Sequence, residues 1–269
     1  MLRLDQLLVE RGLVPSRQRA KELIVGGQVW VNGRKVEKPS AKTAVDASLE
    51  IVGKTLPYPS RAGLKLEKAL QVFAVEVQGK TCLDVGASTG GFTSCLLQAG
   101  AGRVYAVDVG QDQLVPELRA DRRVLVLEKM DIRDLTPEQL PSLADLATID
   151  VSFISLTKVF PAVCALLKAG ADLIALIKPQ FETGGAGLNK RGVIRDPEVH
   201  LKYLPPLMQR LQAENVGLLG FTFSPITGME GNLEFLAHFR KGAPVRDAAD
   251  LVARVIREGW AARQGKDGC

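Results

Sequence analysis

Residues 83–91, Leu-Asp-Val-Gly-Ala-Ser-Thr-Gly-Gly, decide the fold that we expect for this chain of 269 residues. The segment begins in an apolar run, carries an acidic residue, and continues into a turn with three glycines ahead of a helix-length stretch. A strand followed by a glycine turn and a helix is typical of open α/β sheets that bind nucleotides, because glycine lets the backbone approach a ligand. The stretch therefore predicts a nucleotide-type crevice at the end of a strand.

Two positions of the same stretch bear on the identity of the ligand. A dinucleotide fingerprint would have glycine in place of Ser88, and the acidic Asp84 stands inside the motif. Both features favour a nucleoside that carries an amino acid, S-adenosylmethionine, with NAD as the alternative. Asp108 ends the second apolar run and is suited to both ribose hydroxyls, and Asp131 follows the third run, where the adenine amino group is expected. The residues expected to bind the cofactor are Asp84, Gly86, Ser88, Gly90, Gly91, Asp108 and Asp131.

Apolar runs alternate with helix-length amphipathic stretches from residue 81 onward. The expected strands are 81–85, 103–107, 124–127, 145–149 and 172–177. This alternation predicts a largely parallel sheet with helices on both faces, which is a Rossmann-like α/β fold. After a glycine-rich loop at 183–192 and a helix near 197–213, the apolar runs 216–224 and 232–239 are expected to form an antiparallel pair at the sheet edge.

The positive charge of the chain is concentrated near its N-terminus. Residues 1–65 contain twelve Lys and Arg against six Asp and Glu, whereas the rest of the chain has 23 basic and 24 acidic residues. A basic segment on a near-neutral body indicates a module that meets a polyanion, because neutralised phosphates supply most of the sequence-independent affinity for nucleic acid. A solvated basic surface is the alternative interpretation.

The first 53 residues predict a small α+β unit. Helical spacing indicates a first helix that Gly12 ends and a second that Ser16 caps and the glycines at 26–27 stop. Asn32-Gly33 between two alternating apolar runs is a strong signal for a β-hairpin, since a type I′ turn needs two positive φ angles. A further short strand is expected at 49–52.

This unit resembles a known RNA-binding module. Residues 3–5 (Arg-Leu-Asp), 16–17 (Ser-Arg), Ala20 and 27–33 are similar to the S-four domain, first known from the fourth protein of the small ribosomal subunit. The resemblance implies RNA binding but no particular chemistry, because this domain accompanies synthetases, pseudouridine synthases and methyltransferases alike. The basic residues expected to contact RNA are Arg3, Arg17, Arg19, Lys21, Arg34 and Lys35.

Three further segments are expected at strand ends on one edge of the sheet: 150–153 (Asp-Val-Ser-Phe), 178–181 (Lys-Pro-Gln-Phe) and 231–234 (Gly-Asn-Leu-Glu). Ligands of open α/β sheets bind at the edge formed by the carboxyl ends of the strands. Amino-group methyltransferases usually carry a proline-rich tetrapeptide after the fourth strand, whereas 150–153 contains no proline. This difference favours methylation of a hydroxyl group.

With residues 60–65 (Ser-Arg-Ala-Gly-Leu-Lys), the motifs at 84–92, 150–156 and 178–181 make the sequence resemble the TlyA, or hemolysin A, family over essentially the full chain. That family is related to FtsJ-type enzymes. The resemblance implies an S-adenosylmethionine-dependent methyltransferase that acts on the 2′-hydroxyl of cytidine in ribosomal RNA, with ribosomal RNA or ribosomal subunits as partners. The family's Lys-Asp-Lys-Glu tetrad, carried over residue by residue, is Lys65, Asp150, Lys178 and Glu234.

The tetrad suits the reaction that the resemblance implies. A ribose hydroxyl keeps its proton at neutral pH, so methyl transfer needs a group that takes or offsets that proton. Lys178, buried beside a cation such as Lys65, is expected to act as the base or to stabilise the developing alkoxide, while Asp150 and Glu234 orient the ammonium groups. The alternatives are purely structural. Asp150 could cap a helix, Lys178 could be a solvated lysine at a strand end, and Lys65 and Glu234 could be surface charges.

The expected organisation is an RNA-binding domain at 1–53, a linker at 54–60, the methyltransferase domain at 61–245, and a C-terminal helix and tail at 246–269. Four cysteines without a C-x-x-C pair indicate neither a metal site nor disulfides, and charged residues stand where a secretory peptide needs an apolar core. We expect a cytoplasmic protein with no metal, no membrane segment and no obligatory protein partner. The competing interpretations are a pseudouridine synthase, and a non-catalytic RNA-binding or hemolysin-like protein with a degenerate methyltransferase fold.

Overall fold

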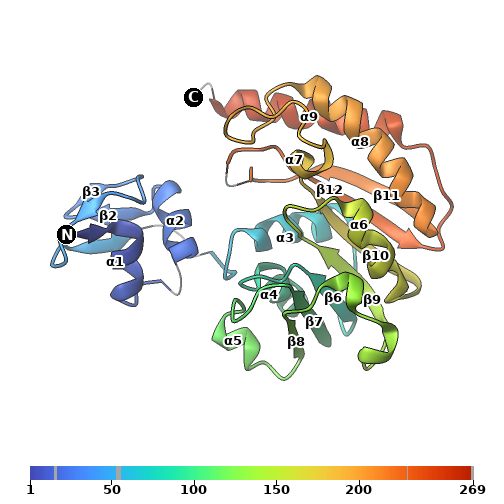
Figure 1. Ribbon diagram of the computed structural model, residues 1–269, viewed down its shortest axis with the longest axis horizontal. Coiled ribbons are helices and arrows are strands. Elements are labelled where there is room, and N and C mark those ends of the chain that lie inside the picture. The colour runs from blue at the N-terminus through green and yellow to red at the C-terminus, as the bar shows by residue number, and fades with distance from the viewer. Residues whose placement is uncertain (15–16, 53–55, 229, 268–269) are drawn as a thin grey trace. The chain divides into compact units, whose positions relative to one another are not determined.

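The computed structural model describes residues 1–14, 17–52, 56–228 and 230–267, so the cap expected from Ser16 lies outside the described residues. The chain divides into two compact units, Met1–Arg61 and Ala62–Cys269 (Figure 1). The division falls one residue after the expected start of the catalytic domain. Each unit has its own set of buried apolar residues.

The N-terminal unit is a small α+β fold, as predicted. Its elements are β1 (Leu2–Arg3), α1 (Leu4–Glu10), α2 (Arg17–Val25), β2 (Val29–Val31), β3 (Arg34–Lys35), β4 (Lys42–Thr43) and β5 (Leu49–Ile51). Asn32 and Gly33 have φ angles of 50° and 74°, which confirms the hairpin turn between β2 and β3. The strands form a sheet in the order β3-β2-β5 and a separate pair, β1 with β4. Arg3 ends β1 and directly precedes α1.

The C-terminal unit contains a seven-stranded sheet in the order β11-β12-β10-β9-β6-β7-β8. Its strands are β6 (Thr81–Val85), β7 (Arg103–Asp108), β8 (Val124–Glu128), β9 (Ala144–Ile149), β10 (Leu167–Ile177), β11 (Val216–Phe223) and β12 (Phe235–Lys241). Strands β6 to β10 are parallel, and β12 lies antiparallel between β10 and β11. The parallel sheet and the antiparallel pair at its edge are confirmed. β10 begins five residues earlier than expected because a break in register between Leu167 and Asp172 precedes its regular part.

Helices cover both faces of this sheet (Figure 1). They are α3 (Ala62–Phe73), α4 (Gly91–Gln98), α5 (Pro116–Arg119), α6 (Leu156–Ala165), α7 (Pro179–Glu182), α8 (Pro197–Leu211) and α9 (Ala249–Asp267). α9 packs on α8 and β11, and Val252 and Ile256 belong to the same apolar core as the sheet. Trp260 Nε1 also donates a hydrogen bond to His200 Nδ1 at 3.0 Å. The segment expected as a C-terminal helix and tail is therefore an integral layer of the catalytic unit.

Asp172 fastens the antiparallel strand β12 to the parallel part of the sheet at the edge formed by the amino ends of the parallel strands. Its carboxylate accepts hydrogen bonds from His238 at 2.9 Å, from Arg240 at 2.9 and 3.0 Å, and from Lys80 at 3.2 Å. Burial alone would raise the pKa of Asp172, but the hydrogen bonds from His238, Arg240 and Lys80 outweigh burial and hold it below its usual range. Asp172 thus links β10, β12 and the residue that precedes β6.

We expect Asp172→Asn to lower the free energy of unfolding at pH 7 by about 3 kcal/mol, the usual cost of breaking a buried ion pair. Since the pKa is lowered on folding, this stabilisation is present above the unfolded value of about 4 and is lost as the pH falls toward the folded value. In urea unfolding, the difference between wild type and variant should therefore shrink below about pH 4.

Glu258→Gln is the matched control, because the Glu258 ion pair with Arg254 is exposed on α9 and spans 3.8 Å. Removing such a pair should change stability by less than about 1 kcal/mol. Equal losses in the two variants would contradict the role assigned to Asp172.

Candidate active site

The candidate site lies at the edge of the sheet formed by the carboxyl ends of β6, β7, β9 and β10. The neighbours β6 and β9 mark the point where the strand order reverses, and ligands of open α/β sheets bind in the crevice outside this point. The glycine turn follows β6, and residues 150–155 follow β9. The two loops that the sequence predicted thus lie side by side at the carboxyl edge of the sheet, where Gly86 meets the backbone of Asp150.

Backbone register brings three members of the tetrad to this edge. Asp150 directly follows Ile149, which pairs with Ala175 of β10. Lys178 follows the last residue of β10, and Glu234 precedes the first residue of β12; those two terminal residues are paired across the strands. The antiparallel direction of β12 explains why a residue before a strand shares an edge with residues that follow strands.

Lys178 and Asp150 form an ion pair in which the Nζ–Oδ1 distance is 2.6 Å. The hydrogen bond that Lys178 donates goes to Ser152 Oγ at 2.8 Å. Asp150 Oδ1 thus faces the Lys178 ammonium, and the Asp150 side chain is partly exposed. A carboxylate has about four acceptor positions, so Asp150 can accept a further hydrogen bond from a ligand.

Lys65 and Glu234 form the second pair, with 2.5 Å between Nζ and Oε2. Lys65 lies on α3 and is 8% exposed, and Glu234 is 2% exposed. A Cβ added at Gly228 would lie 2.6 Å from Glu234 Oε1, so the backbone at Gly228 closes over this carboxylate. The tetrad therefore forms two ion pairs, in which each of the two carboxylates holds one ammonium group.

The glycines of the turn are needed for close packing around the crevice. A Cβ added at Gly86, which has a φ of 85°, would lie 2.4 Å from the carbonyl oxygen of Asp150. Gly90 has a φ of 98° at the start of α4, and a Cβ there would lie 2.2 Å from Leu118. Gly91 is the first residue of α4 and is buried. The glycines thus let this turn pack closely on the Asp150 loop and on Leu118, whereas their contact with the cofactor stays a prediction.

Asp84 lies in the interior of the catalytic unit. The side chain was expected to contact the cofactor, but it is fully buried and accepts hydrogen bonds from Thr93 at 2.7 Å and Thr148 at 3.1 Å. Burial raises the pKa of Asp84 to about 7, although both hydrogen bonds oppose the rise. Asp84 therefore joins the start of α4 to β9, and its contact with the cofactor stays a prediction.

Asp108 joins the loops that follow β6 and β7. Its two carboxylate oxygens accept hydrogen bonds from the backbone N–H groups of Ser88 at 2.8 Å and Gly110 at 2.7 Å. A carboxylate has about four acceptor positions, so about two remain for ribose hydroxyls. The carboxylate is half-buried beside the crevice, as the predicted role requires.

Asp131 caps the short 3₁₀ helix Ile132–Asp134. Its carboxylate accepts hydrogen bonds from the backbone N–H and the guanidinium of Arg133, and these bonds hold its pKa near 2. The carboxylate is thus already engaged by one cation. Its contact with an adenine amino group stays a prediction.

Three residues at this edge were not singled out by sequence reasoning. Ser152 accepts the Lys178 hydrogen bond, and Glu182 of α7 accepts hydrogen bonds from Ser155 and the backbone of Leu156 at the start of α6. Burial raises the pKa of Glu182. No pattern in the sequence marks Glu182.

Phe153 is the third of these residues. It is 90% exposed, has a φ of 64°, and its ring lies 5.0 Å from that of Phe181. Its place in the 150–153 motif was the available signal, because an aromatic residue after the end of a buried strand does not serve the core. The structure leaves this apolar ring open to solvent beside the Lys178–Asp150 pair.

The six residues expected to bind RNA all lie in the N-terminal unit, but their charges are not equally available. Arg3 and Arg17 both bind the buried carboxylate of Asp5, at 2.9 and 3.1 Å, and the hydrogen bond from Arg3 is the main cause that lowers the pKa of Asp5 to about 2. Lys35 pairs with Glu37 at 2.6 Å. Arg34 is exposed at the hairpin, and Arg19 and Lys21 are half-buried on α2.

Each of the two units matches the model of a known protein family. The model of the FtsJ-like methyltransferase family matches residues 58–241, and the model of the S4 domain matches residues 2–43. Membership of the first family implies S-adenosylmethionine as the methyl donor. The alternatives of NAD and of a pseudouridine synthase are therefore wrong.

The chain is similar to several proteins over most of its length. It is 40% identical to 16S/23S rRNA (cytidine-2′-O)-methyltransferase TlyA of Mycobacterium tuberculosis, covering 96% of this chain and 98% of that protein. It is 42% identical to hemolysin A of Brachyspira hyodysenteriae, covering 88% and 99%. The solved structure of a hemolysin candidate from Streptococcus thermophilus has a TM-score of 0.82 at 39% identity, covering 98% of each chain.

The described residues contain neither a membrane-spanning helix nor a metal-binding cluster. None of their helices has both the length and the apolar character needed to cross a membrane. Among the same residues, no group of three or more His, Cys, Asp or Glu side chains is arranged to hold a metal ion.

Since the FtsJ-like model matches more than half of the sequence and TlyA and hemolysin A match nearly all of it, the chain belongs to the FtsJ-like methyltransferase family, among its TlyA and hemolysin A members.

Proposed function

We propose that this protein transfers a methyl group from S-adenosylmethionine to the ribose 2′-hydroxyl of a cytidine in ribosomal RNA. The observation that carries the proposal is the Lys178–Asp150 ion pair at the carboxyl edge of the sheet, in which both side chains remain partly exposed. Cytidine as the target nucleotide and ribosomal RNA as the substrate are supported by the name of the M. tuberculosis relative, an rRNA (cytidine-2′-O)-methyltransferase. A protein that acts on ribosomal RNA would work in the cytoplasm.

The chain's own residues supply what a weakly acidic hydroxyl needs. Asp150 accepts the hydrogen bond of the substrate hydroxyl and takes its proton as that oxygen is methylated, and the adjacent Lys178 ammonium stabilises the negative charge that develops on the ribose oxygen. In its ion-paired form Lys178 is a donor only, which favours the electrostatic role over the role of base. The Lys65–Glu234 pair fixes α3 against β12 behind this centre.

The residues at the crevice fit S-adenosylmethionine. Bound there, the cofactor supplies an activated methyl group on a sulfonium. Asp108 would hold the ribose hydroxyls through the acceptor positions that Ser88 and Gly110 leave open. The turn at 86–90 forms the wall of the crevice with its backbone, because no side chain stands at Gly86 or Gly90.

Two features support RNA as the substrate. The basic N-terminal unit, which matches the S4 domain, would bind phosphates and thereby concentrate the enzyme on RNA. The exposed ring of Phe153 offers a flat apolar surface beside the Lys178–Asp150 pair. Unstacked bases commonly rest on such rings in complexes of proteins with single-stranded RNA.

Lys178→Ala should lower the single-turnover rate of methyl transfer to ribosomal RNA by roughly 100-fold or more, while the affinities for cofactor and RNA persist. Lys178→Arg keeps the positive charge but cannot give up a proton at accessible pH. An active arginine variant would support the electrostatic role of Lys178, and an inactive one would support its role as the base.

Lys158→Ala, at an exposed position on α6, is the matched control. Near wild-type transfer by Lys178→Ala would refute the catalytic role of Lys178. If the wild-type protein itself transfers no methyl group, the alternative of a non-catalytic RNA-binding protein with a degenerate methyltransferase fold would be favoured.

Asp108→Ala should weaken S-adenosylmethionine binding by on the order of 2–4 kcal/mol in titration calorimetry, because two charge-assisted hydrogen bonds to ribose are lost. RNA affinity should change little. Glu117→Ala, at an exposed position on the neighbouring helix α5, controls for the loss of one negative charge. Unchanged cofactor affinity in Asp108→Ala would remove Asp108 from the site.

Deleting residues 1–53 should abolish productive RNA binding but leave a folded protein that still binds the cofactor, because the catalytic unit has its own core. The RNA affinity of the intact protein should fall steeply as salt rises, since released counterions drive binding to phosphates. Filter binding over a salt series and calorimetry with S-adenosylmethionine measure the two effects. Full-rate RNA methylation by the truncated protein would show that the N-terminal unit is not the recognition module.

A further inference from the structure

Residues 189–193 form a tight hairpin in the loop between α7 and α8. Gly192 N–H donates to the carbonyl of Asn189 at 2.9 Å, and the backbones of Asn189 and Val193 are hydrogen-bonded at 3.1 Å. The Asn189 side chain accepts hydrogen bonds from the N–H groups of Arg191 and Val193, and Gly192 has a φ of 72°. The two residues at the tip of this turn are Lys190 and Arg191.

A second segment fastens this hairpin to the candidate active site. Asn232 is 2% exposed, and its amide donates to the carbonyl of Gly192 at 2.9 Å and accepts from the N–H of Ile194 at 3.0 Å. Asn232 stands two residues before Glu234 of the tetrad, and α7 between Lys178 and the loop is only four residues long. Figure 1 shows α7 and the loop that follows it. The hairpin is thereby tied from two sides to the edge of the sheet that carries the tetrad.

The outer side of the hairpin is positively charged. Lys190, Arg191 and Arg195 are all exposed, and no ion pair is recorded for any of them within the described part of the chain. Beneath them, Val193 and Ile194 are 1% and 0% exposed. Three unpaired cations on a backbone that is fixed by side-chain amides and buried apolar residues form a pre-organised surface for an anion.

We propose that the hairpin at 189–193, together with Arg195, binds phosphates of the substrate RNA next to the nucleotide that is methylated, and that Asn232 positions it. The proposal rests on the proposed function, because it assumes that RNA enters at the carboxyl edge of the sheet. Phosphates next to the target nucleotide would meet Lys190 and Arg191 while its ribose faces Asp150. Asn232 is a positioning residue, since it acts through the hairpin.

The test is the Lys190→Ala/Arg191→Ala double variant of the full-length protein, with end-labelled ribosomal RNA fragments as the probe. Each lost phosphate contact should lower the slope of log affinity against log salt by about one, so the double variant should lose about two. Its KM for RNA should rise roughly tenfold while kcat at saturating RNA stays near that of wild type. Calorimetry should show unchanged affinity for S-adenosylmethionine.

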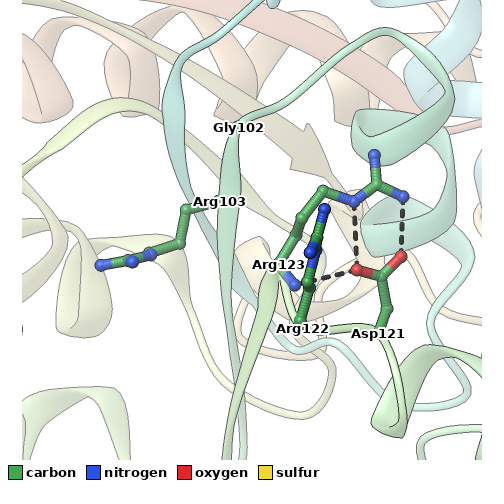
Figure 2. Close-up of a pocket in the computed structure, with 5 residues that line it drawn as sticks. All are labelled: Gly102, Arg103, Asp121, Arg122 and Arg123. Carbon is green, nitrogen blue, oxygen red and sulfur yellow. Dashed lines mark hydrogen bonds and ion pairs between the residues drawn. The ribbon is translucent and has the colours of Figure 1, made fainter.

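Arg103→Ala/Arg122→Ala is the matched control, because it removes the same charge at the opposite edge of the sheet. These arginines border an open pocket of about 700 Å³ with Asp121 and Arg123, which bind each other (Figure 2). The control should keep the wild-type salt slope. A slope loss equal to that of the hairpin variant would assign the effect to net charge and overturn the proposal.

Asn232→Ala tests the positioning role. It should reproduce the slope loss of the double variant, and adding it to the double variant should lower the slope no further, because both changes act on the same contact. An additive loss would overturn the role of Asn232, and a wild-type slope in Lys190→Ala/Arg191→Ala would overturn the phosphate contact. Failure of the wild type to methylate ribosomal RNA would refute the proposed function instead, since the slopes are measured by binding alone.

Discussion

The pairing of buried charges across the end of β12 is the constraint on which the candidate site depends. An ammonium or carboxylate group taken out of water costs several kcal/mol unless an opposite charge and hydrogen bonds compensate it. Glu234 and Lys65 satisfy this condition for each other at 2.5 Å, although they are 169 positions apart in the chain. Their pair fixes the helix that opens the catalytic unit against the last strand of the sheet, and the remaining site lies beside this junction.

The carboxylates at the two edges of the sheet differ in the number of their charged partners. At the amino edge, Asp172 is surrounded by His238, Arg240 and Lys80, and both of its oxygens accept hydrogen bonds. At the carboxyl edge, Asp150 has a single cation, Lys178, at 2.6 Å. A carboxylate with several partners is held in place by them, whereas a carboxylate with one cation keeps acceptor positions for a substrate.

Much of this architecture could be predicted from the sequence because the signals are local. The turn at Asn32-Gly33 and the apolar runs of the parallel strands are set by neighbouring residues, and the structure has them where expected. The pairing within the tetrad could not be predicted, because it depends on the antiparallel insertion of β12 and on which cation meets which carboxylate. The enclosure of Asp84 by Thr93 and Thr148 was also missed, since both threonines read as ordinary helix and strand residues. Glu182 and Asn232 act through contacts between distant segments, which no spacing rule reports.

The close approach of Gly86 to the backbone of Asp150 has a consequence for how this enzyme tolerates change. A single methyl group at residue 86 would meet the carbonyl of Asp150 at 2.4 Å and would have to push the two loops apart. The same movement would displace the carboxylate that pairs with Lys178. A substitution at Gly86 therefore disturbs the glycine turn and the Asp150 loop together, so variants that alter only one of the two loops should be sought at other positions.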